Sequence, residues 1–231
     1  MLALKLGLSL NNIKGSGWSP LNEDSLEAWW KHAELITDSG SPNFSVSQWR
    51  DQSTNNNHLV QATVSEQPTN STGAAKGDIT FDPSNTENMD TTSQISLSGD
   101  FTIGVALNLA SGGCVLLADN TASGEFFRFF STSVIRIRID NTTAVDISKD
   151  SGTFLGKAYM VLSRRSDEIT LYWNGVAQAD TEELAGTADI DNLGVRKTDT
   201  NAYDGIVSEV MIFSSSSAAL ISDVNDRLSS I

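Results

Sequence analysis

Residues 46–58 read VSQWRDQSTNNNH, and this stretch decides the fold. Val46 and Trp49 are apolar residues placed to anchor a strand, and Asp51 is a short hydrogen-bond acceptor just before a polar turn. The Asn run at 55–57 suits left-handed backbone geometry, which Asn tolerates better than most residues. The stretch therefore predicts a strand that ends in a tight loop.

Apolar alternation recurs along the chain. Every second residue is apolar in 101–109, in 135–139 and in 169–173, which places these side chains on one face of a strand. Clusters of Gly, Asn, Asp and Ser separate the segments. Short strands with regular turn signals predict an all-β sandwich. Residues 22–36 are compatible with helix or strand, because good helix formers there also alternate.

The composition limits the class of protein. With 231 residues, 39% of them hydrophobic, the chain can bury a core, and a sandwich of this length is commonly one domain. The formal net charge of -14 repels phosphate backbones and anionic lipids, so we expect no nucleic-acid partner and no membrane insertion. The single cysteine, Cys114, excludes an internal disulfide and is expected to be a buried small hydrophobe.

The first ten residues alternate between leucine and small or polar residues. This period of two predicts a strand with one apolar face rather than a secretory signal, so we expect synthesis in the cytoplasm without secretion. Residues 1–17 are interpreted as a strand and linker, and 18–231 as the domain. The strand either closes the sandwich as an edge or acts as an assembly arm that pairs with a neighbouring subunit. Its leucines are Leu2, Leu4, Leu6, Leu8 and Leu10.

The order of residues in 46–58 resembles the W-x-D-x-S-G-x-G-N-H element of laminin G-like domains, which belong to the concanavalin A-like lectin/glucanase superfamily. Residues 79–82, 169–176 and 203–213 are similar to the family elements V-x-F-D-G, L-Y-V-N-G-x and F-x-G-x-I-A-E-V-x-I-Y. The resemblance implies a concanavalin A-like jelly-roll sandwich of two antiparallel sheets. It also favours strand within residues 22–36, where the family has an opening L-x-L-W-L-D-A strand.

A short C-terminal helix completes the predicted fold. The serine run at 214–217 can cap it, and its apolar stripe is formed by Leu220 or Ile221 together with Val224 and Leu228. Such a helix is again similar to the family.

The sequence offers no recognisable catalytic motif. Glucanases of this fold carry two glutamates in an E-x-D-x-E strand, and the nearest run here, residues 188–192, has no glutamate. His32 and His58 are the two histidines, and His58 is expected to be a structural turn residue. We therefore predict that the chain is not an enzyme and has no catalytic residues. Arg136 and Arg138 are interpreted as part of a solvated charged face, with salt bridges between subunits of a homo-oligomer as the alternative.

Ligand sites are predicted only in outline. No cofactor is expected other than calcium, which laminin G-like domains often hold through loop oxygens. Trp18 and Tyr203 are candidate stacking platforms for glycans. The candidate calcium ligands are Asp82, Glu87, Asp119 and Asp140, with Asn120 and Asn141.

The resemblance and the composition together favour a structural protein of a tailed-bacteriophage virion. We expect a capsid decoration protein on the head surface, assembled in the host bacterial cytoplasm and docked by its N-terminal strand. Its partners would be other virion proteins, such as the major capsid protein or a tail component. The alternative is a carbohydrate-binding lectin or adhesion module of a tail fibre or tail tip that recognises host-surface glycans. A hydrolase is disfavoured by the missing glutamates.

Overall fold

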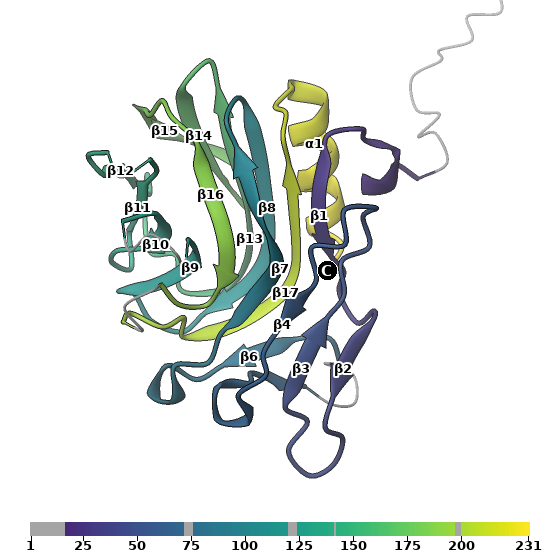
Figure 1. The fold of residues 1–231 in the computed structure, drawn as a ribbon. Helices are drawn as coiled ribbons and strands as arrows, with labels where there is room; N and C mark the ends of the chain where they lie inside the picture. Colours follow the sequence, from purple (N-terminus) through teal and green to yellow (C-terminus); the bar gives the residue numbers. More distant parts are fainter. Residues whose placement is uncertain (1–16, 72–75, 120–123, 141, 197–199) are drawn as a thin grey trace, which may run out of the picture.

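The computed structural model describes residues 17–71, 76–119, 124–140, 142–196 and 200–231. These residues form two antiparallel sheets packed face to face, with a C-terminal helix against one of them (Figure 1). The predicted all-β jelly-roll sandwich is thus confirmed. The predicted assembly arm, Leu2 to Leu10, lies outside the described residues.

Sheet A is the sheet that carries the helix. Its strands follow the order β15-β14-β13-β8-β17-β6-β5, and β1 also pairs with β17. The bounds are β1 Leu26–Trp30, β5 Thr69–Asn70, β6 Ile79–Phe81, β8 Phe101–Leu109, β13 Gly156–Arg165, β14 Glu168–Trp173, β15 Val176–Glu183 and β17 Gly205–Phe213. The segment compatible with helix or strand therefore contains the strand that the family resemblance favoured.

Sheet B faces sheet A across the core, and its strands follow the order β12-β11-β10-β9-β16-β7-β4-β3-β2. The bounds are β2 Ile36–Asp38, β3 Val46–Trp49, β4 Leu59–Val60, β7 Met89–Leu97, β9 Cys114–Ala118, β10 Phe126–Phe129, β11 Val134–Arg138, β12 Val145–Ser148 and β16 Ala188–Leu193. Short 3-10 helices span Pro20–Asn22 (η1), Val64–Glu66 (η2) and Pro83–Asn85 (η4).

The core fills the space between the two sheets. In β14, the alternating side chains Ile169, Leu171 and Trp173 are buried, as the sequence predicts. In β11, Ile135 and Ile137 belong to the same core cluster. The residues between them in β11 consequently point away from sheet A, because successive strand residues face opposite sides of a sheet.

Helix α1, Ala218–Leu228, covers the outer face of sheet A (Figure 1). The Ser217 hydroxyl accepts from the Leu220 N–H at 3.1 Å and caps the helix, as predicted. Gly104 in β8 permits the close packing, because a Cβ there would lie 2.4 Å from a methyl group of Val224. Among the described residues, no helix is long and apolar enough to cross a membrane.

The stretch 46–58 forms the predicted strand and tight loop. The buried Asp51 carboxylate accepts from the backbone N–H groups of Trp29, Ser53 and Asn57 at 2.8, 2.8 and 2.9 Å. His58 lies in the loop just before β4, and its Nδ1 accepts from the Asp51 N–H at 3.2 Å. These donors satisfy the hydrogen-bonding capacity of the buried carboxylate and fix the loop geometry.

Glu209 in β17 is a second buried carboxylate, with 0% exposure. It accepts from the indole N–H of Trp29 at 2.9 Å and from the backbone N–H of His32 at 3.0 Å. Both of its oxygens also accept from the Arg227 guanidinium of α1 at 2.8 Å. This carboxylate therefore joins β1, β17 and the helix.

We predict that Glu209→Gln lowers the free energy of unfolding by about 3 kcal/mol, because breaking a buried ion pair leaves the partner charge uncompensated. Urea unfolding followed by tryptophan fluorescence measures the change. Glu183→Gln makes the same substitution at an exposed position of β15 and should have little effect. Equal stability of the Glu209 variant and the wild type would contradict the assignment.

Candidate functional site

The outer face of sheet B carries a cluster of arginines. In β10, Phe127 and Phe129 pack in the core, so Phe126 and Arg128 lie on the outer face. The pairing of β10 with β11 places Arg138 opposite Phe126, and it places Arg136 directly opposite Arg128. Two adjacent strands therefore present three guanidinium groups on one surface.

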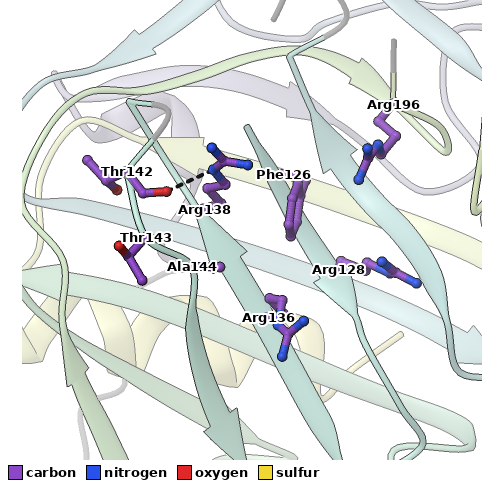
Figure 2. Close-up of a pocket in the computed structure, with 8 residues that line it drawn as sticks. All are labelled: Phe126, Arg128, Arg136, Arg138, Thr142, Thr143, Ala144 and Arg196. Carbon is purple, nitrogen blue, oxygen red and sulfur yellow. Dashed lines mark hydrogen bonds between the residues drawn. The ribbon is translucent and has the colours of Figure 1, made fainter. Parts of the chain in front are cut away.

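These side chains line an open pocket of about 690 Å³ (Figure 2). The turn between β11 and β12 forms one side, and Arg196, which follows β16, forms another. The lining residues are Phe126, Arg128, Arg136, Arg138, Thr142, Thr143, Ala144 and Arg196. The volume lies within the range of roughly 300–1,000 Å³ that is typical of small-ligand sites.

Two of the arginines are fixed by neighbouring oxygen atoms. Arg136 donates two hydrogen bonds to the Asp146 carboxylate at 2.6 and 2.7 Å, and these bonds lower the pKa of Asp146. Its guanidinium also lies 3.5 Å from the ring centroid of Phe130. Arg138 donates from Nε to the Thr142 carbonyl at 2.8 Å (Figure 2). Both guanidinium groups are thus oriented before any ligand arrives.

Arg128 lies between two other positive charges. Its Nη2 donates to the Gly113 carbonyl at 3.1 Å and to the Asn201 side-chain oxygen at 3.0 Å. Within the described ranges, its buried Nε has no hydrogen-bond partner. Burial lowers the pKa of Arg128, and the charges of Arg196 and Arg136 lower it further. This guanidinium thus donates to two neutral oxygens and lies near two like charges.

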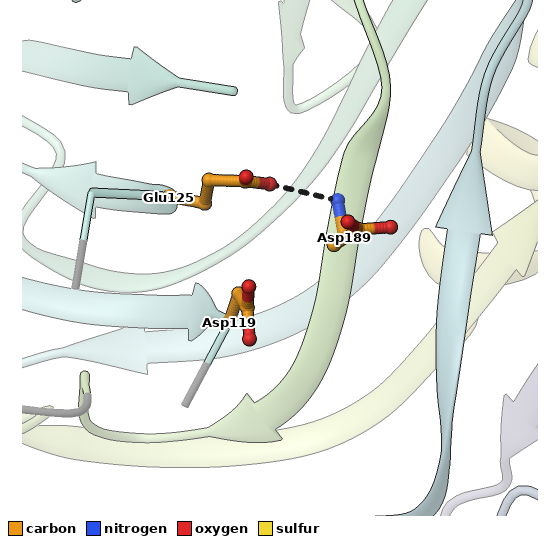
Figure 3. Close-up of side chains that lie close together, drawn as sticks. All are labelled: Asp119, Glu125 and Asp189. Carbon is orange, nitrogen blue, oxygen red and sulfur yellow. Dashed lines mark hydrogen bonds between the residues drawn. The ribbon is translucent and has the colours of Figure 1, made fainter. Parts of the chain in front are cut away.

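Three carboxylates lie close together near the start of β10, and we call them the carboxylate group (Figure 3). Asp119 follows β9, Glu125 immediately precedes β10, and Asp189 belongs to β16. One oxygen from each lies within 4.8 Å of the others. The Glu125 carboxylate also accepts from the Asp189 N–H at 3.1 Å. Burial raises the pKa of Glu125, and the charges of Asp189 and Asp119 raise it further.

The carboxylate group fits a calcium ion better than the predicted ligands Asp82 and Glu87 do. Carboxylates are the oxygen donors that Ca²⁺ prefers, at about 2.3–2.6 Å, so oxygens up to roughly 5 Å apart can share one ion. Asp119 belongs to this group, and Asp140 contributes a backbone hydrogen bond to Glu125. Asp82 instead caps η4, and Glu87 accepts from the Asp82 N–H at 2.7 Å.

The predicted glycan platforms are placed differently from expectation. Tyr203 is 0% exposed and packs edge-on against Phe81, so it offers no ring face to a sugar. Its role as a platform was therefore predicted wrongly. Trp18 is partly buried, contacts Phe213 and donates to Glu23 at 2.8 Å. Neither residue lines the arginine pocket.

Sequence reasoning identified Arg136 and Arg138 only as a charged face, and it did not select the other pocket residues. Alternation in 126–129 could have placed Arg128 on an outer face, since phenylalanines flank it. Nothing in the local pattern brings Arg196 near it. Asp119 was a predicted calcium ligand, whereas Glu125 and Asp189 were not selected.

Comparison with known proteins gives a structural likeness without a sequence match. Neither a protein-family model nor a curated protein matches the sequence. The fold resembles domain 4 of a GH43 extracellular arabinanase from Geobacillus stearothermophilus, in complex with arabinotriose, with a TM-score of 0.59 and 11% identity. The alignment covers 89% of this chain and 98% of that one.

Two further structures share the sandwich. A Trypanosoma rangeli sialidase mutant that displays trans-sialidase activity has a TM-score of 0.53 and 12% identity, over 89% of this chain and 33% of that one. A GH54 α-L-arabinofuranosidase has a TM-score of 0.56 and 14% identity, over 80% and 50%. This chain thus spans a third to a half of those proteins, and the likeness establishes the shared fold.

The prediction that the chain is not an enzyme is contradicted by these neighbours, which are named as glycoside hydrolases and a sialidase. That prediction relied on the missing E-x-D-x-E motif. The physical reason for the error is that carboxylates need not come from one strand. Asp119, Glu125 and Asp189 meet from three separate segments of the chain.

The raised pKa of Glu125 predicts a pH-dependent stability. Because the folded-state pKa lies above the ordinary value of 4.5, the folded protein binds this proton more tightly than the unfolded chain. The resulting stabilisation is complete below pH 4.5 and is lost as the pH rises through the raised pKa. In the presence of EDTA, Glu125→Gln should therefore raise the melting temperature at neutral pH but not below pH 4.5. A variant that is less stable at neutral pH would contradict this prediction.

Calcium should reverse the order of the melting temperatures of the wild type and the Glu125→Gln variant at neutral pH. If Asp119, Glu125 and Asp189 hold the ion, adding calcium raises the melting temperature of the wild type more than that of Glu125→Gln. Glu183→Gln, on exposed β15, serves as the matched control and should respond as the wild type does. An equal response of all three proteins would exclude this group as a calcium site.

Proposed function

We propose that this chain is a carbohydrate-binding domain that holds an oligosaccharide in the pocket on the outer face of sheet B. The observation that carries the proposal is the open pocket of about 690 Å³, built on a sheet face that no helix covers among the described residues. Its position on strands β10 and β11 gives it a rigid floor, because side chains on a sheet are held by the core behind them.

The lining chemistry suits a sugar. Thr142 and Thr143 are exposed and offer hydroxyl groups that both donate and accept hydrogen bonds. The guanidinium groups of Arg136 and Arg138 offer fixed donors, and Phe126 adds an apolar surface. Sites of this kind combine an apolar wall with a few oriented polar groups, which set the ligand orientation.

The structural neighbours support the same conclusion. The arabinanase domain, aligned over 98% of its length, is described in complex with arabinotriose, so a sandwich of this shape can hold an oligosaccharide. The other two neighbours are proteins that are named for acting on saccharides. From these neighbours we infer the class of ligand, a saccharide, and not a particular sugar.

Blocking the pocket should abolish binding. Ala144→Trp adds a large side chain to the pocket lining, and Ala177→Trp adds the same side chain to exposed β15 of sheet A. We expect glycan-array binding and calorimetric affinity to be lost in the first variant and kept in the second. If Ala144→Trp still binds the glycan, the binding site lies outside this pocket. If the wild-type protein binds no glycan, the proposal is refuted.

Hydrolysis of the bound glycan is the second candidate, and the carboxylate group favours it. Retaining glycosidases use two carboxyl groups about 5 Å apart, one of them with a raised pKa. Glu125 has a raised pKa, lies within 4.8 Å of two other carboxylates and adjoins the pocket residue Phe126. Release of reducing ends from glycans that bind, lost in Glu125→Gln while binding is kept, would establish it. Unchanged release in that variant would exclude Glu125.

The virion role stays a prediction from the sequence. It rests on the resemblance of residues 46–58 to an element of laminin G-like domains. A decoration protein on the head surface, or a lectin-like module at the tail, would be recovered from purified particles at fixed stoichiometry. Absence from particles would reject both placements and leave the sugar-binding proposal intact.

A further inference from the structure

We infer that the saccharide held on the outer face of sheet B is acidic, and that its carboxylate or sulfate group contacts Arg128 and the arginines beside it. The inference rests on the proposed carbohydrate-binding function and adds the chemical class of the ligand. It starts from the distribution of charge. The chain has a net charge of -14, yet four of its eight arginines line this one pocket.

The pairing of β10 with β11 places two positive charges opposite each other. Arg128 and Arg136 are directly opposite each other on β10 and β11, where like charges destabilise a sheet. Arg196 adds a third positive charge that acts on Arg128. An anion bound between these groups would offset the repulsion, whereas a neutral ligand would leave it in place.

The hydrogen bonds show which guanidinium has capacity for an anion. Arg136 already has a carboxylate partner in Asp146. Arg128 donates to two neutral oxygens, and its Nε has no partner within the described part of the chain. Charge-assisted hydrogen bonds are about twice as strong as neutral ones, and the planar guanidinium matches the two oxygens of a carboxylate. Arg128 therefore gains more from an acidic ligand than Arg136, which already has a carboxylate partner.

Phenylalanine rings hold the guanidinium groups in place. The Arg128 and Arg136 guanidinium groups lie 5.4 and 3.5 Å from the ring centroid of Phe130, and Arg196 lies 5.6 Å from that of Phe126. Contacts of this kind reduce the freedom of a long side chain before it binds. The arginines thus form an ordered site rather than a loose basic surface.

The nearby carboxylate group limits how an acidic ligand can be oriented in the pocket. Glu125 precedes Arg128 by three residues along the chain, which corresponds to about 10 Å at strand spacing. The arginines of the pocket would attract an acidic sugar, and the carboxylate group beyond Phe126 would repel it. A long polyanion such as a nucleic acid would have to cross both regions and face the overall negative charge. The arrangement therefore favours a saccharide with a single acidic group placed at Arg128.

The test compares charged and neutral forms of the same sugar. Calorimetry at low salt would use glucuronic acid with its methyl ester, and glucose 6-sulfate with glucose, because each acid form carries a single acidic group. We expect the acid form of at least one pair to bind about tenfold tighter than the neutral form. The pair that shows this preference distinguishes a carboxylate ligand from a sulfate ligand.

Variants show which residue causes the preference for the acid form of the sugar. Arg128→Met should remove the tenfold advantage, and Arg128→Lys should keep part of it, because lysine keeps the charge without the planar fork. Arg165→Met removes the same charge from an exposed position on sheet A and should change nothing. Melting curves establish that each variant is folded. If Arg128→Met does not fold, Arg128→Lys still tests the inference, which fails if its affinity for the acid form equals that of the wild type.

The outcomes separate this inference from the proposed function. If neutral and acidic forms bind equally, the ligand is not acidic, and carbohydrate binding stands. If the wild type binds none of these sugars and no glycan on an array, both conclusions fall. If Arg165→Met loses as much affinity as Arg128→Met, the preference comes from overall charge and the inference is overturned. If a single-stranded oligonucleotide binds more tightly than every sugar and depends on Arg128, the site is a phosphate site and the inference is also overturned.

Discussion

Trp29 is held between two buried carboxylates, and the rest of the fold depends on this arrangement. Its backbone N–H donates to Asp51 and its indole N–H donates to Glu209. Asp51 shapes the loop after β3 of sheet B, whereas Glu209 lies on β17 of sheet A and also binds Arg227 of α1. Because a buried carboxylate requires donors around it, β1, the loop and the helix must take up fixed positions together.

The fixed helix decides which sheet face is open to ligands. Helix α1 covers the outer face of sheet A with Leu220, Val224 and Leu228, so apolar residues on that face are buried. Sheet B has no helix on its outer face among the described residues, and its side chains there are largely polar or charged. The arginine pocket lies on this open face (Figure 2), and the carboxylate group is formed by residues at the ends of β9 and β10 and by Asp189 of β16 (Figure 3).

The two sites on sheet B carry opposite charges and share strand β10. Glu125 immediately precedes this strand, and Arg128 lies within it. Their pKa values shift for one common reason, since burial disfavours the charged form of each and like charges lie nearby. Like charges therefore repel one another both in the arginine pocket and in the carboxylate group. A bound anion would relieve it at the arginines and a bound cation at the carboxylates.

The sequence by itself determined several strands, among them those at 101–109, 135–139 and 169–173, together with the C-terminal helix and the loop at 46–58, because alternation, capping and turn chemistry act between residues close in the chain. It also indicated that Arg136 and Arg138 share a face. Only the tertiary structure decided that Arg128 lies opposite Arg136, that Arg196 joins them, and that Asp119, Glu125 and Asp189 meet. The physical reason is that the pairing of distant strands sets these contacts. No local pattern encodes that pairing, since register depends on how two whole faces pack together.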